Sequence, residues 1–365
     1  MTLDAAMPRM LGVLMLVGLA ACGGCAAQGS SETASTAPFE RLFTKLGDFQ
    51  LADATGRIDY QSLDPAARRL YVAKMGAGQL LQVDIGRNEL IAALDGFPKV
   101  TGVLVVPELH KLYASVPGAG LFPALTVALG MIGLSSGRGA VAILDTNDLH
   151  EIARLPGGVF PDGIAYDPAD RRIFVSDELG SAVLVIDADA DHVVSRIDLG
   201  GEVGNVRYDP ITSKIYAPIQ SRNELAVIDP KDARLVARYP LPGADHPHGL
   251  AIAPGAAIGY VACDGNDRLL TVDLATGKIA SNQRVAHDPD VLAIDGQAAR
   301  LYVASESGTL SIFDITNVAA PAALGEVFVG KDAHSVAVDP LSHRLYFPLA
   351  DAQGRAVMRV LAPKP

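Results

Sequence analysis

The sequence predicts an all-β chain folded as a seven-bladed β-propeller, in which each blade is a four-stranded antiparallel sheet. Three observations lead to this prediction. One unit of about 42 residues recurs between residues 57 and 361. Each copy has room for four short strands, and turns rich in Gly, Asn and Asp separate those strands. We expect the propeller to occupy residues 47–361.

The repeated unit starts with an apolar strand that ends in Asp-Pro, continues with a Leu/Ile-Tyr/Phe-Val strand, and closes with a strand that ends in Val-Ile-Asp. Residues 163–187 and residues 205–229 are two closely matching copies. The closing aspartates are Asp84, Asp145, Asp187, Asp229, Asp273 and Asp314. Their spacings of 61, 42, 42, 44 and 41 residues have the period of propeller blades. A seventh copy at residues 334–361 lacks the final aspartate.

The seventh copy ends after its third strand, so a different segment must complete its sheet. Residues 47–52 read Gly-Asp-Phe-Gln-Leu-Ala and precede the first copy. We predict that they form the outer strand of blade seven and close the ring, because closure removes open sheet edges.

An aromatic residue recurs in the second strand of every copy. The seven are Tyr71, Tyr113, Phe174, Tyr216, Tyr260, Tyr302 and Tyr346. We interpret them as packing residues between neighbouring blades, because large aromatic side chains at one repeated position bury much apolar surface.

The segments at residues 70–73 and 301–304, both Leu-Tyr-Val-Ala, and the Val-Ile-Asp endings resemble the YVTN-repeat β-propellers. The resemblance extends over about residues 57–361. It implies a propeller of the kind found in bacterial envelopes and archaeal surface layers. It implies little about activity, because propellers carry many unrelated functions.

The N-terminus has the pattern of an export signal. Arg9 precedes an apolar stretch at residues 10–19, and Leu19-Ala20-Ala21-Cys22 is similar to a bacterial lipobox. We predict a lipoprotein signal peptide at residues 1–22, with lipidation of Cys22 and a flexible tether and lead-in at residues 23–46. The protein would then be exported and held to the membrane on the periplasmic or outer side. A signal peptide cleaved without lipidation is the alternative.

Composition excludes other classes of protein. The net charge is −11 and the basic residues are scattered, so nucleic acid is not an expected partner. Cys22 and Cys25 lie at the N-terminus and Cys263 is the third cysteine, so no internal disulfide is expected. Cys263 reads as a buried apolar residue. We expect a monomeric propeller that packing alone stabilises.

The spacing of 61 residues shows that blade two carries an insertion, at residues 118–138, and this insertion is almost wholly apolar. It is too short to cross a bilayer. A helix or lid packed on the propeller, a surface that meets a partner or a membrane, and an unstructured excursion all remain open. Residues 362–365 form a short tail.

Candidate site residues come from the start of the innermost strands, where side chains face the central channel. This position reads Asp59, Thr101, Asp162, Gly204, His248, Asp290 and His334. Two residues earlier, His246, Asp288 and Asp332 follow the same pattern, and His287 is adjacent. Imidazoles and carboxylates that converge suit zinc, iron, copper or manganese. We therefore expect His246, His248, Asp290 and His334 to be candidate ligands of a divalent transition metal, although solvated polar side chains would give the same pattern.

Three functions follow from these residues. The first is a binding or scaffold protein that holds a protein or small-molecule ligand at the channel mouth. The second is a metal-dependent enzyme that resembles propeller lactonases and lyases, and the third is a periplasmic metal or redox partner. The sequence has no phosphate-binding loop and no dinucleotide fingerprint in a strand-turn-helix context, and no cofactor follows from it with certainty. The first function is therefore favoured over an enzyme.

Overall fold

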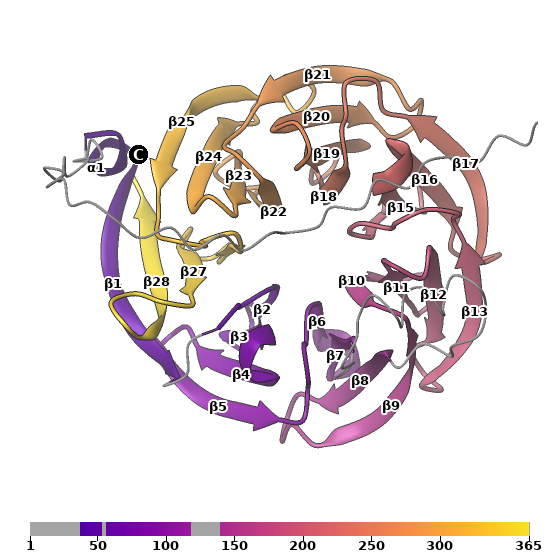
Figure 1. Ribbon diagram of the computed structural model, residues 1–365, viewed down its shortest axis with the longest axis horizontal. Coiled ribbons are helices and arrows are strands. Elements are labelled where there is room, and N and C mark those ends of the chain that lie inside the picture. The colour runs from indigo at the N-terminus through magenta and orange to yellow at the C-terminus, as the bar shows by residue number, and fades with distance from the viewer. Residues whose placement is uncertain (1–36, 53–55, 118–138, 365) are drawn as a thin grey trace, which may run out of the picture. The chain divides into compact units, whose positions relative to one another are not determined.

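A computed structural model describes residues 37–52, 56–117 and 139–364. Within these residues the strands form seven four-stranded antiparallel sheets arranged as a ring (Figure 1). This is the predicted seven-bladed β-propeller. The predictions for residues 1–36, including Cys22 and the tether, and for the insertion at residues 118–138 lie outside the described residues. In the described part of the chain, no helix is long and apolar enough to cross a membrane.

Blades one to four follow one another along the chain, and each runs from the channel to the rim. Their strands are β2 (Gln61–Asp64), β3 (Arg69–Lys74), β4 (Gln79–Asp84) and β5 (Glu89–Asp95); β6 (Val103–Val106), β7 (Lys111–Val116), β8 (Gly139–Asp145) and β9 (Glu151–Gly158); β10 (Pro161–Asp167), β11 (Arg172–Asp177), β12 (Ala182–Asp187) and β13 (His192–Asp198); and β14 (Arg207–Asp209), β15 (Lys214–Ile219), β16 (Glu224–Asp229) and β17 (Arg234–Pro240).

Blades five and six repeat this order, and blade seven combines the two ends of the described chain. The strands are β18 (Pro247–Ile252), β19 (Ile258–Cys263), β20 (Arg268–Asp273) and β21 (Ile279–Arg284); β22 (Pro289–Asp295), β23 (Arg300–Ser305), β24 (Thr309–Asp314) and β25 (Ala322–Phe328); and β26 (Ala337–Val338), β27 (Leu345–Leu349), β28 (Ala356–Pro363) and β1 (Phe43–Ala52). Helix α1 (Ala37–Leu42) precedes β1, and the short 3-10 helices are η1 (Met75–Ala77), η2 (Pro107–Leu109) and η3 (Gln220–Arg222).

The ring closes through β1, which pairs with β28 as the outer strand of blade seven (Figure 1). Closure by a strand N-terminal to the first copy is confirmed. The pairing is longer than residues 47–52, because it runs from Phe43 opposite Pro363 to Ala52 opposite Ala356. Phe43 is buried and its ring lies 6.4 Å from that of Tyr302 in blade six, which holds the beginning of the strand in place.

Apolar side chains pack mainly between neighbouring blades. The inner strands β3 and β4 are buried along most of their length, whereas the rim strand β5 alternates between exposed and half-buried residues. The seven recurring aromatic residues are all buried, as predicted. Two of them also bridge blades, because the hydroxyl of Tyr216 donates to the carbonyl of Leu274 and that of Tyr260 to the carbonyl of Val318.

Glycines let the innermost strands approach one another closely around the channel. A Cβ atom on Gly102 would lie 1.9 Å from the carbonyl oxygen of Asp162, and one on Gly249 would lie 2.2 Å from the carbonyl oxygen of Asp290. A side chain at either position would therefore push two blades apart. The close approach is what brings the channel-facing side chains of neighbouring blades together.

Candidate ligand-binding site at the channel mouth

The upper mouth of the channel is the end at which the innermost strands begin, and the lower mouth is the end at which they turn outward. At the upper mouth, Asp59, Asp290 and His334 come from blades one, six and seven. One ligand-type atom from each residue lies within 4.8 Å of the other two, and all three residues are buried. Among the described residues, this is the group of histidine, cysteine and acidic side chains whose geometry suits a metal ion.

His334 is held so that its Nε2 atom faces the carboxylates. Its Nδ1 lies 3.0 Å from the carbonyl oxygen of Asp332, to which it can donate, and 3.3 Å from a carboxylate oxygen of Glu306. Its Nε2 lies 3.8 Å from Oδ1 of Asp59 and has no hydrogen-bond partner among the described residues, although the side chain is only 2% exposed. In the neutral imidazole, a proton on Nδ1 leaves the Nε2 lone pair free, as in histidines that bind metals.

In both Asp59 and Asp290, one carboxylate oxygen faces a histidine and the other faces Arg57. Oδ1 of Asp290 lies 3.6 Å from Nε2 of His248 and has no hydrogen bond within the described residues. The Oδ2 atoms of Asp59 and Asp290 each lie 3.8 Å from a guanidinium nitrogen of Arg57. Arg57 is partly exposed, and its shortest ion pair, of 2.6 Å, is with Glu306. The Oδ1 atoms therefore face the imidazoles, whereas Arg57 approaches the Oδ2 atoms from the solvent side.

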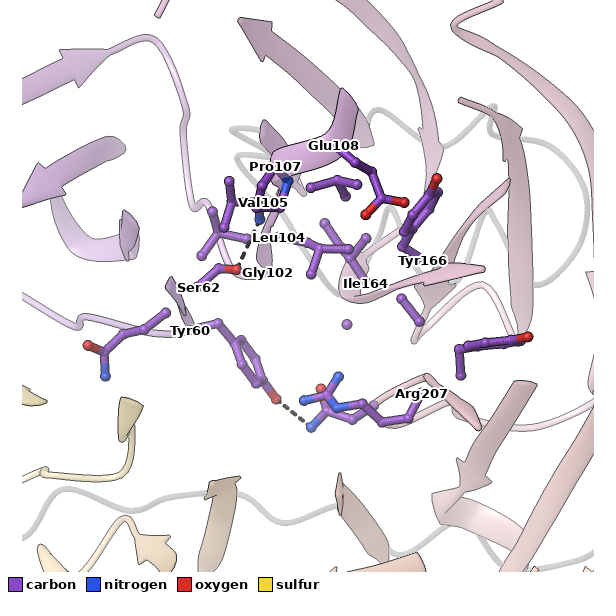
Figure 2. Close-up of a pocket in the computed structure, with 17 residues that line it drawn as sticks. Tyr60, Ser62, Gly102, Leu104, Val105, Pro107, Glu108, Ile164, Tyr166 and Arg207 are labelled. Atoms are coloured by element: carbon purple, nitrogen blue, oxygen red, sulfur yellow. Dashed lines mark hydrogen bonds between the residues drawn. The ribbon is translucent and has the colours of Figure 1, made fainter. Parts of the chain in front are cut away.

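His248 joins this group to a hydrogen-bonded bridge across the channel. Its Nε2 lies 3.1 Å from the hydroxyl of Tyr60, and its Nδ1 lies 3.2 Å from Oε1 of Gln220. Nδ2 of Asn205 donates to the same Tyr60 hydroxyl at 2.8 Å. Because Tyr60 belongs to blade one and its partners to blades four and five, its side chain spans the channel. Figure 2 shows Tyr60 extending toward the strand that carries Arg207.

Carboxylates outnumber cations in this buried site, and the pKa values reflect this excess. Burial and the charge of Glu178 raise the pKa of Asp162 to about 8. Burial also raises the pKa of Asp290, to about 6, although His248 and His334 oppose the rise. An additional positive charge would relieve the repulsion between these groups.

The histidines respond in the opposite way to burial but are also shifted upward. Burial lowers the pKa of His248, yet the carboxylates of Asp290 and Glu178 outweigh that effect and raise it to about 9. The pKa of His334 is raised for the same reason, by Asp59 and Asp290 against the effect of burial. Both imidazoles therefore bind a proton more tightly than a free histidine, as expected in a site that attracts cations.

The other sequence candidates lie outside this group. Nδ1 of His246 lies 2.6 Å from Asp264 and its Nε2 lies 3.5 Å from Glu202, so the structure does not join it to His334 and Asp290. The side chain of His287 is 79% exposed and faces Asp267. His246, Asp288 and Asp332 have φ angles of 53°, 60° and 56°. A left-handed residue two positions before the channel-facing residue places its side chain in the turn, and the expected four-ligand set with His246 is therefore not assembled.

Sequence reasoning missed the residues that line the mouth from the turn between the second and third strands. Glu178, Gln220 and Glu306 each occupy the first position of that turn in their blade, as does Asp264. Aligning the copies on the end of the second strand would have found them, because four adjacent blades carry a polar residue there. Nothing in the sequence marked Tyr60, because a tyrosine beside Asp59 predicts no particular role.

Comparison with known proteins supports the fold and adds no function. The chain is similar to a chain of Kuenenia stuttgartiensis hydrazine synthase, with a TM-score of 0.69, 16% identity and coverage of 84% of this chain and 96% of that chain. At this identity the likeness concerns the fold alone. No protein-family model and no curated protein matches the sequence.

Proposed function

We propose that the protein is a non-catalytic binding protein whose upper channel mouth holds a divalent transition metal ion. The observation that carries the proposal is the trio of Asp59, Asp290 and His334, in which two buried polar atoms, Oδ1 of Asp290 and Nε2 of His334, have no hydrogen-bond partner in the described structure. Leaving such atoms unpaired is costly, and a cation bound between them would remove that cost.

The trio supplies a donor set suited to zinc and similar ions. One imidazole nitrogen and two carboxylate oxygens leave a fourth position open, as in zinc sites with three protein ligands. Zinc holds such ligands at about 2.0 to 2.2 Å, so the donor atoms around it lie about 3.5 Å apart. The present separations between donor atoms are at most 4.8 Å, and side-chain movements of roughly 1 Å would bring these atoms to zinc-binding distances.

A cavity open at the upper mouth also reaches His334. A cavity of about 390 Å³ at the upper mouth is lined by Arg57, Glu306, Asp332 and His334, among others. Arg57 lies on this side of the aspartates, so a metal ion that enters must displace its guanidinium or share the carboxylates with it. Binding would then be reversible and sensitive to Arg57, which fits a binding protein better than a permanently loaded centre.

Isothermal titration of the purified, metal-free full-length protein with zinc chloride tests the proposal. We expect one site per chain, and His334→Asn and Asp290→Asn should each weaken it at least tenfold. His287→Asn is the matched control, because His287 is exposed outside the mouth, and it should leave the affinity unchanged. Absence of saturable zinc binding, or equal affinities in all three variants, would contradict the proposal.

The proposal places the propeller in the cell envelope, tethered by a lipid on Cys22. Its support is the sequence of residues 1–22 together with the resemblance to YVTN-repeat propellers. Mass spectrometry of the N-terminal peptide from the membrane fraction should show an acylated cysteine. Cys22→Ser should release the protein from the membrane, whereas Cys25→Ser should not. Release by neither variant would contradict a Cys22 anchor.

A further inference from the structure

A second cavity lies in the lower half of the channel, on the far side of Tyr60 from the upper mouth. Its volume is about 360 Å³, within the size range of small-molecule sites. The innermost strands of blades one to four and the turn at η2 form its walls (Figure 2). Val103, Val105, Ile164 and Ala165 make one part of the lining apolar.

Arg207 is the cation in this lining, and it lacks an anionic partner. Its NH1 group donates to the carbonyl oxygen of Val206 at 2.8 Å, and within the described part of the chain it forms no ion pair. Other arginines at blade edges do form ion pairs, such as Arg238 with Glu224 at 3.1 Å. A guanidinium that lies in a channel without a carboxylate partner is unusual, because removing its charge from water is costly when no anion compensates.

The carboxylates nearest to this cavity do not neutralise Arg207. Glu108 also lines the cavity, and in Figure 2 its carboxylate points toward Tyr166 rather than toward Arg207. Asp162 lies near enough to act on Arg207 through its charge, yet burial dominates and lowers the pKa of Arg207. An anion that enters the cavity would restore the missing partner.

We propose that the lower cavity binds a small organic carboxylate with a branched apolar body. The planar guanidinium of Arg207 matches a carboxylate through two parallel hydrogen bonds, and Val103, Val105 and Ile164 offer contact to the apolar part. A mineral anion such as phosphate would leave these apolar walls against a fully polar ligand. This site is separate from the upper mouth, and the inference does not depend on metal binding.

Ligand-observed NMR with the full-length protein compares isovalerate with isovaleramide, its neutral isostere. We expect the wild-type protein to bind isovalerate at least tenfold more tightly than isovaleramide. Arg207→Gln should remove that preference by weakening isovalerate at least tenfold, while the weak binding of isovaleramide stays the same. Arg222→Gln is the matched control, because Arg222 is about half exposed at the surface, and it should behave as the wild type.

Three results would overturn the inference. They are no binding of isovalerate by the wild type at 10-millimolar concentration (about 3 kcal/mol of binding free energy), equal affinities for the acid and the amide, and displacement of isovalerate by inorganic phosphate at equal concentration. The comparison of acid with amide uses the wild-type protein alone, so it decides the matter even if Arg207→Gln fails to fold.

Discussion

Asp162→Asn should stabilise the protein, and the gain should grow with pH. The carboxyl of Asp162 is buried, and its folded-state pKa of about 8 lies above the unfolded value of 3.8. A group whose pKa is raised by folding favours the folded state while it is protonated, and that advantage is lost as pH rises from about 4 to 8. The amide of asparagine has the same shape and stays neutral throughout.

The magnitude follows from the two pKa values. One pKa unit corresponds to about 1.4 kcal/mol, so the raised pKa of Asp162 lowers the free energy of unfolding by roughly 2 kcal/mol at pH 5 and by about 5 kcal/mol at pH 8. Urea denaturation at both pH values measures the free energy of unfolding. We expect the difference between Asp162→Asn and the wild type to widen by about 3 kcal/mol from pH 5 to pH 8.

Asp170→Asn is the matched control, because Asp170 is an exposed aspartate in the same blade. It should change the free energy of unfolding by less than about 0.5 kcal/mol at either pH. The reasoning is refuted if Asp162→Asn is less stable than the wild type at pH 8, or if its gain is the same at both pH values. Either result would mean that folding does not raise the pKa of the Asp162 carboxyl.

Other predictions concern the upper mouth and the packing beneath it. Arg57→Gln should raise zinc affinity about tenfold in calorimetry, because it removes a charge that lies roughly 6 Å from the bound ion in a hydrated setting; an unchanged or lower affinity would count against the role given to Arg57. Zinc affinity should fall as pH is lowered from 8 to 6, since the raised pKa of His334 makes protons compete for Nε2; an affinity independent of pH would exclude His334 as a ligand. Gly249→Ala should destabilise the protein by about 1 to 3 kcal/mol in urea denaturation, because the new Cβ would lie 2.2 Å from the carbonyl oxygen of Asp290. Gly296→Ala should destabilise it less, because its Cβ would meet only the side chain of Pro254, at 3.2 Å, and no backbone atom of a neighbouring blade. Equal stability of the two glycine variants would show that the blades can separate without cost.

The fold could be predicted from the sequence because the same strand pattern recurs seven times. Closing aspartates such as Asp187 and Asp229 fix the register of each copy, and the missing strand of the last copy could be assigned to a specific segment. The first residue of the closing strand could not be predicted, because burial of Phe43 against blade six depends on contacts between segments far apart in sequence.

The site was less accessible to sequence reasoning because its geometry depends on backbone conformation. Asp290 and His334 lie together at the upper mouth, as expected for residues at the start of innermost strands. His246, however, is itself a turn residue with a positive φ angle, and it contacts Asp264 instead. Glu306 enters the site from the turn after the second strand, which carries no repeated signal in all seven copies. Arg57 stands two residues before Asp59, at the same repeat position as His246, but nothing in its residue type predicted contact with the aspartates. Arg207 gave no signal, because an arginine without an ion pair can be recognised only when its surroundings are known.

Zinc K-edge X-ray absorption of the loaded full-length protein tests the central claim most directly. The predicted result is a first shell of nitrogen and oxygen at about 2.0 to 2.2 Å that contains one imidazole, which is lost in His334→Asn. A shell without imidazole, or a spectrum that His334→Asn leaves unchanged, would contradict a metal held by Asp59, Asp290 and His334.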